Sequence, residues 1–275
     1  YLVHQYWLMF GDRTIPERHY DAVRKHIGWL LGKLENGIST DIFADWYPPH
    51  LTTSYPQGPE GPRLVGTAFV IRILQEGAAL ADLLGKQTDA RRWRVRADEL
   101  TRRFDEEFFD AETGTYRTER PVGLRQTSQA VPLQVGLVPK DRVNDLVAEL
   151  AADVERKGNH LDTGSIGTSA LPFALTDHGD PPRPDLALAV LQQRTYPGYG
   201  YLRSLGATTF WESWEKDSRG HNDSTLSSPG RCGWGAWPGC GRCGRARRIC
   251  CSWAWAAICW ATIAVWMPWN SPSSQ

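Results

Sequence analysis

Residues 64–109 read LVGTAFVIRILQEGAALADLLGKQTDARRWRVRADELTRRFDEEFF, and this stretch decides the fold class. Leu64–Lys86 places Ala, Leu and Ile on one face at helical spacing, which predicts a long helix. Thr88-Asp89 is a suitable cap for a second helix, which we expect to end before Asp110. Two long helices joined by a short turn form a helical hairpin.

The same succession of helix, loop and helix continues on both sides of this hairpin. Long Gly- and Pro-rich loops separate the helices, and no alternating apolar run is long enough to predict a sheet. We therefore expect an all-α fold, a toroid of helical hairpins. A TPR-like solenoid would also pair its helices, but the fixed period of about 34 residues that it requires is absent from the sequence. The further predicted helices span residues 16–35, which Asn36-Gly37 ends, and residues 127–137, 139–156, 165–178 and 184–194.

The charge balance and the motif content exclude several functions. The formal net charge is +0, which argues against a nucleic-acid or anionic-membrane partner recruited by bulk charge. The sequence contains neither a Gly-rich phosphate loop nor a G-x-S-x-G nucleophile motif. We expect no cofactor and no metal, and a carboxylate-based hydrolase is the enzyme class that remains.

Composition changes abruptly near the C-terminus. All six Cys follow Gly230, and Asp, Glu and Lys are absent from Ser224 onward. A zinc module at Cys240-Gly-Arg-Cys243 would need further ligands, yet this region has no second C-x-x-C and no His. A transmembrane segment at Ile249–Met267 would be unusually rich in Trp, Ala and Cys. We favour a third interpretation, out-of-frame translation of GC-rich DNA.

These observations divide the chain in two. Residues 1–227 are the predicted domain, and residues 228–275 are an aberrant tail without a fold of its own. Tyr1–Trp7 resembles a helix face more than a signal peptide, and no initiator Met is present. We therefore expect the chain to begin inside a larger protein, and its cellular compartment stays open.

One short stretch carries the strongest signal for chemistry. Gly206–Trp214 reads GATTFWESW, which places Glu212 between Trp211 and Trp214. A carboxylate beside aromatic faces can have its pKa and its water contacts tuned for acid/base work. Sugar rings also stack on aromatic faces, so Glu212 is a candidate catalytic residue in a carbohydrate site, with Trp211 as a candidate substrate contact.

Other loops gather polar and aromatic residues. Asp45-Trp46 could bind sugar hydroxyls and stack on the ring, or Asp45 could simply cap a helix. His160 and Asp162 lie in a Gly-framed loop that suggests a pocket wall, although Asp162 could instead begin the next helix. His221 follows in a polar segment, where a single His is more often solvated than bound to a ligand.

Taken together, these loops resemble the bacterial α-L-rhamnosidases of glycoside hydrolase family 78 over roughly residues 1–227. The individual matches are short, and their order and spacing make the set specific. The matching stretches are Gly11-Asp12, Asp45-Trp46, Gly66–Phe69, Gln126–Ala130, Gly158–Gly164, Thr195–Tyr201, Gly206–Glu212 and His221-Asn222.

The resemblance implies an (α/α)6 barrel, incomplete in this chain, that removes terminal α-L-rhamnose with inversion. It implies that Glu212 is the general base and that Trp46, Trp211 and His221 surround the sugar. His160 and Asp162 are further pocket residues, and the substrate would be a rhamnose-containing oligosaccharide or glycoside. The Leu-Gly-Trp-Thr-Gly-Asp-like run that follows the family's general acid is absent from this chain, so we expect the chain alone to be inactive.

Two other functions stay open from the sequence. One is a different (α/α)6 carbohydrate-active enzyme, which a panel of substrates would distinguish. The other is a non-catalytic sugar-binding helical toroid, for which saccharide binding would not depend on Glu212.

Overall fold

The computed structural model describes residues 2–42, 44–50, 58–207, 211 and 214. These residues fall into two compact units, Tyr1–Val190 and Leu191–Gln275, divided within one helix. The predicted tail, residues 228–275, lies outside the described residues.

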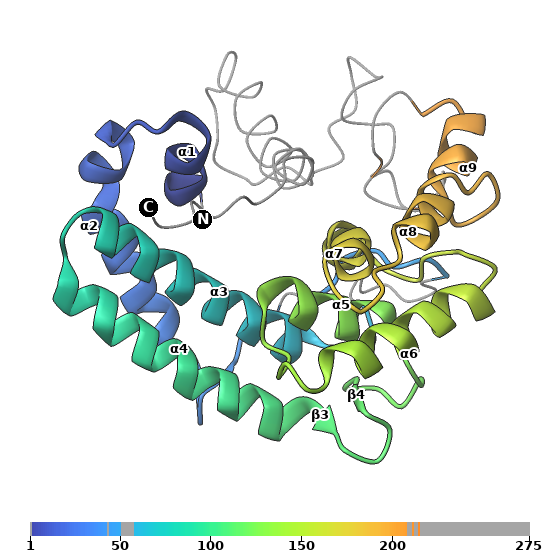
Figure 1. The fold of residues 1–275 in the computed structure, drawn as a ribbon, viewed down its shortest axis with the longest axis horizontal. Coiled ribbons are helices and arrows are strands. Elements are labelled where there is room, and N and C mark those ends of the chain that lie inside the picture. Colours follow the sequence, from blue (N-terminus) through green and yellow to red (C-terminus); the bar gives the residue numbers. More distant parts are fainter. Residues whose placement is uncertain (1, 43, 51–57, 208–210, 212–213, 215–275) are drawn as a thin grey trace, which may run out of the picture. The chain divides into compact units, whose positions relative to one another are not determined.

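Almost all of the regular secondary structure in the described part of the chain is helical (Figure 1). Two antiparallel pairs of two-residue strands are its only sheet structure, β1 (Leu34–Glu35) with β2 (Ile38–Ser39) and β3 (Phe109–Asp110) with β4 (Thr115–Tyr116). The helices are α1 (Leu2–Phe10), α2 (Thr14–Leu31), α3 (Pro62–Leu83), α4 (Gln87–Phe108), α5 (Gln126–Val135), α6 (Val143–Arg156), α7 (Ser165–Thr176), α8 (Pro184–Leu191) and α9 (Tyr199–Ser204).

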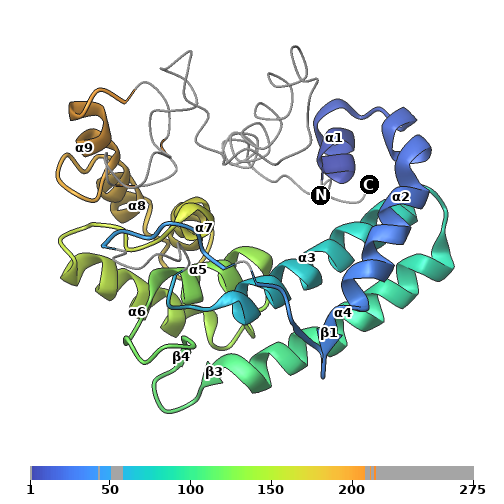
Figure 2. The ribbon, with the colours of Figure 1, turned by 180° about the vertical axis from the view of Figure 1, so that it is seen from behind.

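The hairpin of α3 and α4 forms as the sequence predicts. Its two helices run side by side, and α2 crosses this hairpin (Figures 1 and 2), packing against α3 and placing Tyr20 against Trp93 of α4. α4 buries Ala90, Trp93, Ala97, Leu100, Phe104 and Phe108. These residues follow one another at three- and four-residue spacing, so α4 covers the core with a single stripe.

The central helix α3 is buried along most of its length. Pro62–Leu83 is also the one described helix long and apolar enough to cross a membrane, but 61% of its apolar window is buried inside the fold. Gly77 explains how closely α2 approaches it, because a Cβ there would lie 2.5 Å from Cδ1 of Ile27. Its apolar composition therefore reflects contact with other helices.

Of the three buried helices α3, α5 and α7, the first and the last each follow one of the polar loops noted in the sequence. α5 packs against both α3 and α7. Pro132 lies inside α5, and the helix continues past it to Val135 and ends at Gly136 in the left-handed conformation. The loops before α5 and α7, together with the Asp45 segment that precedes α3, therefore meet around the N-terminal ends of α5 and α7.

Several predicted boundaries differ from the structure by a few residues. The first predicted helix stops at Leu31, and Asn36-Gly37 forms the turn of the β1–β2 hairpin, with φ of 51° and 82°. Positive φ at both positions suits a tight hairpin turn, which an Asn-Gly pair adopts readily. The two strand pairs and α9 were not predicted, since all are shorter than the window over which periodicity can be read.

Candidate active site

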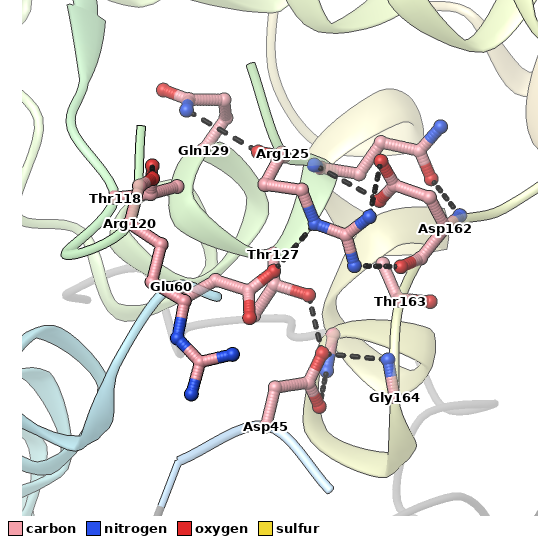
Figure 3. Close-up of polar contacts among 12 residues, drawn as sticks. Asp45, Glu60, Thr118, Arg120, Arg125, Thr127, Gln129, Asp162, Thr163 and Gly164 are labelled. Carbon is pink, nitrogen blue, oxygen red and sulfur yellow. Dashed lines mark hydrogen bonds and ion pairs between the residues drawn. The ribbon is translucent and has the colours of Figure 1, made fainter. Parts of the chain in front are cut away.

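The carboxylate of Asp45 caps a helix that lies far away in the sequence. Asp45 is fully buried, and its Oδ1 accepts hydrogen bonds from the backbone N–H groups of Ile166 at 2.8 Å and Gly167 at 3.1 Å. Its Oδ2 accepts the N–H of Gly164 at 2.6 Å and the hydroxyl of Thr127 (Figure 3). Of the two roles open from the sequence, the geometry matches capping, and the capped helix is α7.

Burial and hydrogen bonding act on Asp45 in opposite directions. Burial raises the pKa of the Asp45 carboxyl, while the Thr127 hydroxyl and the three backbone N–H groups favour its ionised form. The positive end of the α7 dipole adds to the stabilisation of a negative charge.

Trp46 is held at the same helix end through its backbone. Its carbonyl oxygen accepts the N–H of Ser165 at 2.8 Å and the Ser165 hydroxyl at 3.3 Å. A Cβ on Gly164 would lie 2.2 Å from that oxygen, so only glycine fits there. The Trp46 side chain is half-buried and meets the Tyr47 ring nearly at a right angle, with 5.6 Å between centroids.

Asp162 caps the N-terminus of α5 in the way that Asp45 caps that of α7. Its Oδ1 accepts the N–H of Gln126, the first residue of α5, at 3.2 Å, and its own N–H donates to Gln126 Oε1 at 2.8 Å. Lys157 Nζ lies 2.6 Å from Asp162 Oδ2. Asp162 is 7% exposed, so its carboxylate is engaged with the protein on several sides.

Arg125 joins this loop to a third segment. Its Nη1 lies 3.2 Å from Asp162 Oδ2, its Nη2 donates to the Asp162 carbonyl, and its Nε donates to Glu60 Oε1 at 3.0 Å (Figure 3). Glu60 is fully buried, and its Oε2 has no hydrogen-bond partner among the described residues. Burial and the nearby Asp45 carboxylate raise the pKa of Glu60 to about 7, against the opposing charge of Arg125.

His160 has a local partner in the same loop. Its Nδ1 lies 3.0 Å from the carbonyl oxygen of Lys157, and its ring is half-buried. Its own carbonyl accepts a hydrogen bond from Gln126 Nε2 at 3.1 Å. The backbone of His160 therefore braces the start of α5, while its partly exposed ring stays a candidate for substrate contact.

The second unit contains the remaining candidates. The Tyr199 and Trp214 rings meet edge to face at 5.6 Å, and Tyr196 and Tyr201 do so at 5.3 Å. Burial raises the pKa of Tyr199 to about 12. Trp211 is half-buried, and Glu212 and His221 lie outside the described residues. The predicted roles of these three residues therefore remain predictions.

Within the described residues, neither a metal-binding cluster nor the cavity beside α2 points to another site for the same chemistry. Among the residues that the structure describes, no group of three or more His, Cys, Asp or Glu could hold a metal ion. A cavity of about 580 Å³ lies where α2 meets the turn between α3 and α4, lined by residues that include Tyr20, Lys86 and Asp89. None of the predicted site residues lines it.

Comparison with known families decides the relationship. The family described as the bacterial α-L-rhamnosidase six-hairpin glycosidase domain matches residues 1–230. The chain belongs to this family. An α-L-rhamnosidase from Alteromonas sp. (strain LOR) is 31% identical over 228 residues, which are 81% of this chain and 24% of that protein. One from Streptomyces avermitilis is 30% identical over 210 residues, which are 75% of this chain and 18% of that protein.

Solved structures agree. The α-L-rhamnosidase from Dictyoglumus thermophilum matches with a TM-score of 0.68 and 29% identity, over 75% of this chain and 23% of that one. The S. avermitilis enzyme, solved in complex with L-rhamnose, matches with a TM-score of 0.64 and 26% identity, over 78% of this chain and 19% of that one. The all-α, six-hairpin fold class is thus confirmed, and the chain spans about a quarter of the length of the relatives it matches.

Three residues of the buried network were missed by the sequence reasoning. Thr127 was noted only within a matching stretch, and Glu60 and Arg125 received no role. Glu60 did leave a signal, because it is the one charged residue in the Gly- and Pro-rich run Pro56–Pro62. A charge retained in such a loop suggests a specific partner, but its identity depends on the fold.

Proposed function

We propose that this chain is the part of an α-L-rhamnosidase catalytic domain that supplies the general base and part of the sugar pocket. The whole protein would remove terminal α-L-rhamnose from oligosaccharides or other glycosides, with inversion. The observation that carries this proposal is the fixed Trp46 loop at the N-terminus of α7, in a chain whose family and structural neighbours are α-L-rhamnosidases. A neighbour solved with L-rhamnose bound supports the choice of sugar.

The proposed chemistry needs two carboxyl groups. In an inverting glycosidase one carboxylic acid protonates the leaving oxygen, while a carboxylate on the opposite face activates water. Glu212 is proposed as the water-activating base, with Trp211 and His221 beside the sugar. Residues 1–275 contain no run like the one that follows the family's general acid, so we propose that this chain alone does not complete the reaction.

The buried network revises the roles proposed for two of the loop residues. Both carboxylate oxygens of Asp45 are taken by protein donors, which supports a role in holding Trp46 over one in binding hydroxyls. Asp162 is likewise engaged with α5, Lys157 and Arg125. Within the first unit, Tyr1–Val190, we propose that Trp46 and His160, which are both half-buried, contact the substrate.

Hydrolysis of p-nitrophenyl α-L-rhamnoside tests the proposal. The whole protein should release nitrophenol, Glu212→Gln should reduce kcat by at least about a thousandfold, and the first sugar product should be β-L-rhamnose by proton NMR. Glu112→Gln is the matched control, since Glu112 is an exposed residue in the turn between β3 and β4. Full activity in Glu212→Gln would remove the base role, and α-L-rhamnose as first product would remove inversion.

A second assay tests residues 1–275 alone. They should bind L-rhamnose without releasing nitrophenol. Clear hydrolysis by these residues that disappears in Glu212→Gln would contradict the proposal that the general acid lies elsewhere. In the assay of the whole protein, release of other sugars in preference to rhamnose would instead indicate a different (α/α)6 carbohydrate enzyme.

A further inference from the structure

We infer that Asp45 is a positioning residue for the sugar site. Its buried carboxylate fixes the backbone of Trp46 against the N-terminus of α7 and so sets where the indole of Trp46 meets the sugar. This inference rests on the proposed function, because it takes Trp46 as a sugar contact.

The dipeptide Asp45-Trp46 takes all the free donors at the start of α7. The N–H groups of four consecutive residues, Gly164 to Gly167, donate to these two residues. Three of them reach the Asp45 carboxylate, and the fourth reaches the Trp46 carbonyl. The next N–H, that of Thr168, returns to the Gly164 carbonyl, which begins the regular hydrogen bonding of the helix.

A helix end normally has these donors satisfied by water or by a local cap. Here the donors at the start of α7 bond instead to Asp45 and Trp46, which precede them in the sequence by 119 to 122 positions. The loop of Trp46 therefore cannot shift along α7 without leaving several buried donors unpaired, which fixes its register.

Packing removes the remaining freedom at this contact. A Cβ on Gly164 would lie 2.2 Å from the Trp46 carbonyl oxygen and 2.9 Å from Asp45 Oδ1. The backbone of Asp45 is anchored as well, since its carbonyl accepts the N–H of Gly58 at 2.8 Å. Asp45 is thus held by both its side chain and its main chain.

The backbone after Trp46 is in an unfavourable conformation. Tyr47 and His50 have φ of 52° and 61°, in the left-handed region that residues with side chains seldom adopt. Such conformations persist where surrounding contacts over-determine them, as at ligand-binding sites. The bonds of Asp45 supply that constraint immediately before Trp46, so the aromatic face is prepared before any sugar arrives.

Fluorine NMR of the full chain labelled with 5-fluorotryptophan tests the inference. The Trp46 resonance is identified by its loss in Trp46→Phe. In Asp45→Asn, an amide faces donors that need a carboxylate, so the Trp46 resonance should move in the sugar-free protein and the Kd for L-rhamnose should rise about tenfold. Binding is measured at a temperature where circular dichroism shows the variant folded.

Asp12→Asn is the matched control. Asp12 also caps a helix, accepting the N–H of Thr14 in α2 at 2.8 Å, and its other carboxylate oxygen accepts the Tyr6 hydroxyl, so neither of these bonds involves Trp46. This variant should leave both the Trp46 resonance and the Kd unchanged. If Asp45→Asn does not fold, Thr127→Val replaces it, because it removes one donor to the Asp45 carboxylate and keeps the shape of the side chain. The Trp46 resonance should again move.

The outcomes separate the inference from the proposed function. A folded Asp45→Asn, or Thr127→Val in its place, with the wild-type Trp46 resonance and wild-type Kd overturns the positioning role. A wild-type chain in which L-rhamnose moves no fluorine resonance overturns the proposed sugar site. Displacement of the Trp46 resonance in the sugar-free variants would still show that Asp45 controls Trp46, whatever its ligand.

Discussion

Two aspartates cap helices in this protein in opposite ways. Asp12 accepts the N–H of Thr14, two residues on, at the exposed start of α2, and its other oxygen accepts the Tyr6 hydroxyl at 2.9 Å. Asp45 is fully buried and caps α7 across at least 119 positions. The first contact organises one turn of chain, whereas the second joins the loop before α3 to the starts of α5 and α7.

The difference shows what a buried cap adds. An exposed N–H group that loses its cap forms a hydrogen bond with water instead. A buried N–H group finds no other acceptor and bears the full penalty of desolvation. The Asp45 contact therefore ties the position of a candidate sugar-binding loop to the stability of the whole unit. The predictions below test that contrast.

The largest effect is expected from Asp45→Ala. Three backbone N–H groups and the Thr127 hydroxyl would lose their acceptor inside the protein, and each unpaired buried group costs roughly 1–3 kcal/mol. We expect a loss of about 5 kcal/mol in the free energy of unfolding, measured by urea denaturation. Asp12→Ala, in which water replaces the lost acceptor, should shift the midpoint far less. Equal midpoints would refute the contrast.

The next effect is expected from Arg125→Met. Arg125 is 15% exposed and lies between Glu60 and Asp162, so its removal leaves the buried Glu60 carboxyl without its cation and leaves Asp162 paired with Lys157 alone. Breaking such a buried pair typically destabilises by about 3–5 kcal/mol, and we expect about 4 kcal/mol by urea denaturation. The control is Arg92→Met. Arg92 is 62% exposed in its pair with Asp89, and loss of such surface pairs costs under about 1 kcal/mol. Similar losses in the two variants would contradict the buried role of Arg125.

Glu60 should make stability depend on pH. Its pKa is raised from 4.5 to about 7 by burial and by the Asp45 carboxylate, opposed by Arg125. Between these values the folded state retains a proton that the unfolded state has released, so stability falls as pH rises through this window. A shift of this size corresponds to about 3 kcal/mol.

The comparison with Glu60→Gln isolates this effect. The amide that this substitution introduces keeps an acceptor for Arg125 and cannot ionise, so the variant should lose less stability than wild type as pH rises from 4.5 to about 7. His4 and His178, whose pKa values are lowered by burial, titrate alike in both proteins and cancel in the difference. Parallel curves of unfolding free energy against pH would contradict the raised pKa of Glu60.

The sequence predicts local features of this protein better than distant ones. The α3–α4 hairpin could be predicted to within a few residues because its apolar stripes repeat every three or four positions. The choice between a capping and a sugar-binding role for Asp45 stayed open because the N–H groups that it caps, at the start of α7, lie 119 to 122 positions away in the sequence. No local pattern encodes such a contact, which exists only once α5 and α7 are packed together.

Glu60 could not be predicted for a related reason. Its neighbours Pro59 and Gly61 predict a loop, and loops usually lie at the surface. The fold instead buries the side chain beside Asp45 and Arg125, which come from two other segments. For Glu212 and His221 the resemblance to the family is the basis of the predicted roles, and those roles await the rhamnoside assay.

The smallest effect is expected from Thr127→Val, which removes one of the four donors to Asp45 and keeps the shape of the side chain. A hydrogen bond to a charged group contributes about 1.5–3 kcal/mol, and the remaining backbone donors still hold the carboxylate, so we expect about 1.5 kcal/mol by urea denaturation. Thr101→Val is the matched control. The Thr101 hydroxyl donates to the Ala97 carbonyl within α4 at 2.9 Å, a bond that adds little to a helix already hydrogen-bonded along its backbone. Equal losses in the two variants would show that the Thr127 hydroxyl stabilises the protein no more than a hydroxyl bonded within its own helix. A larger loss in Thr127→Val would show that α5 shares the buried cap of α7.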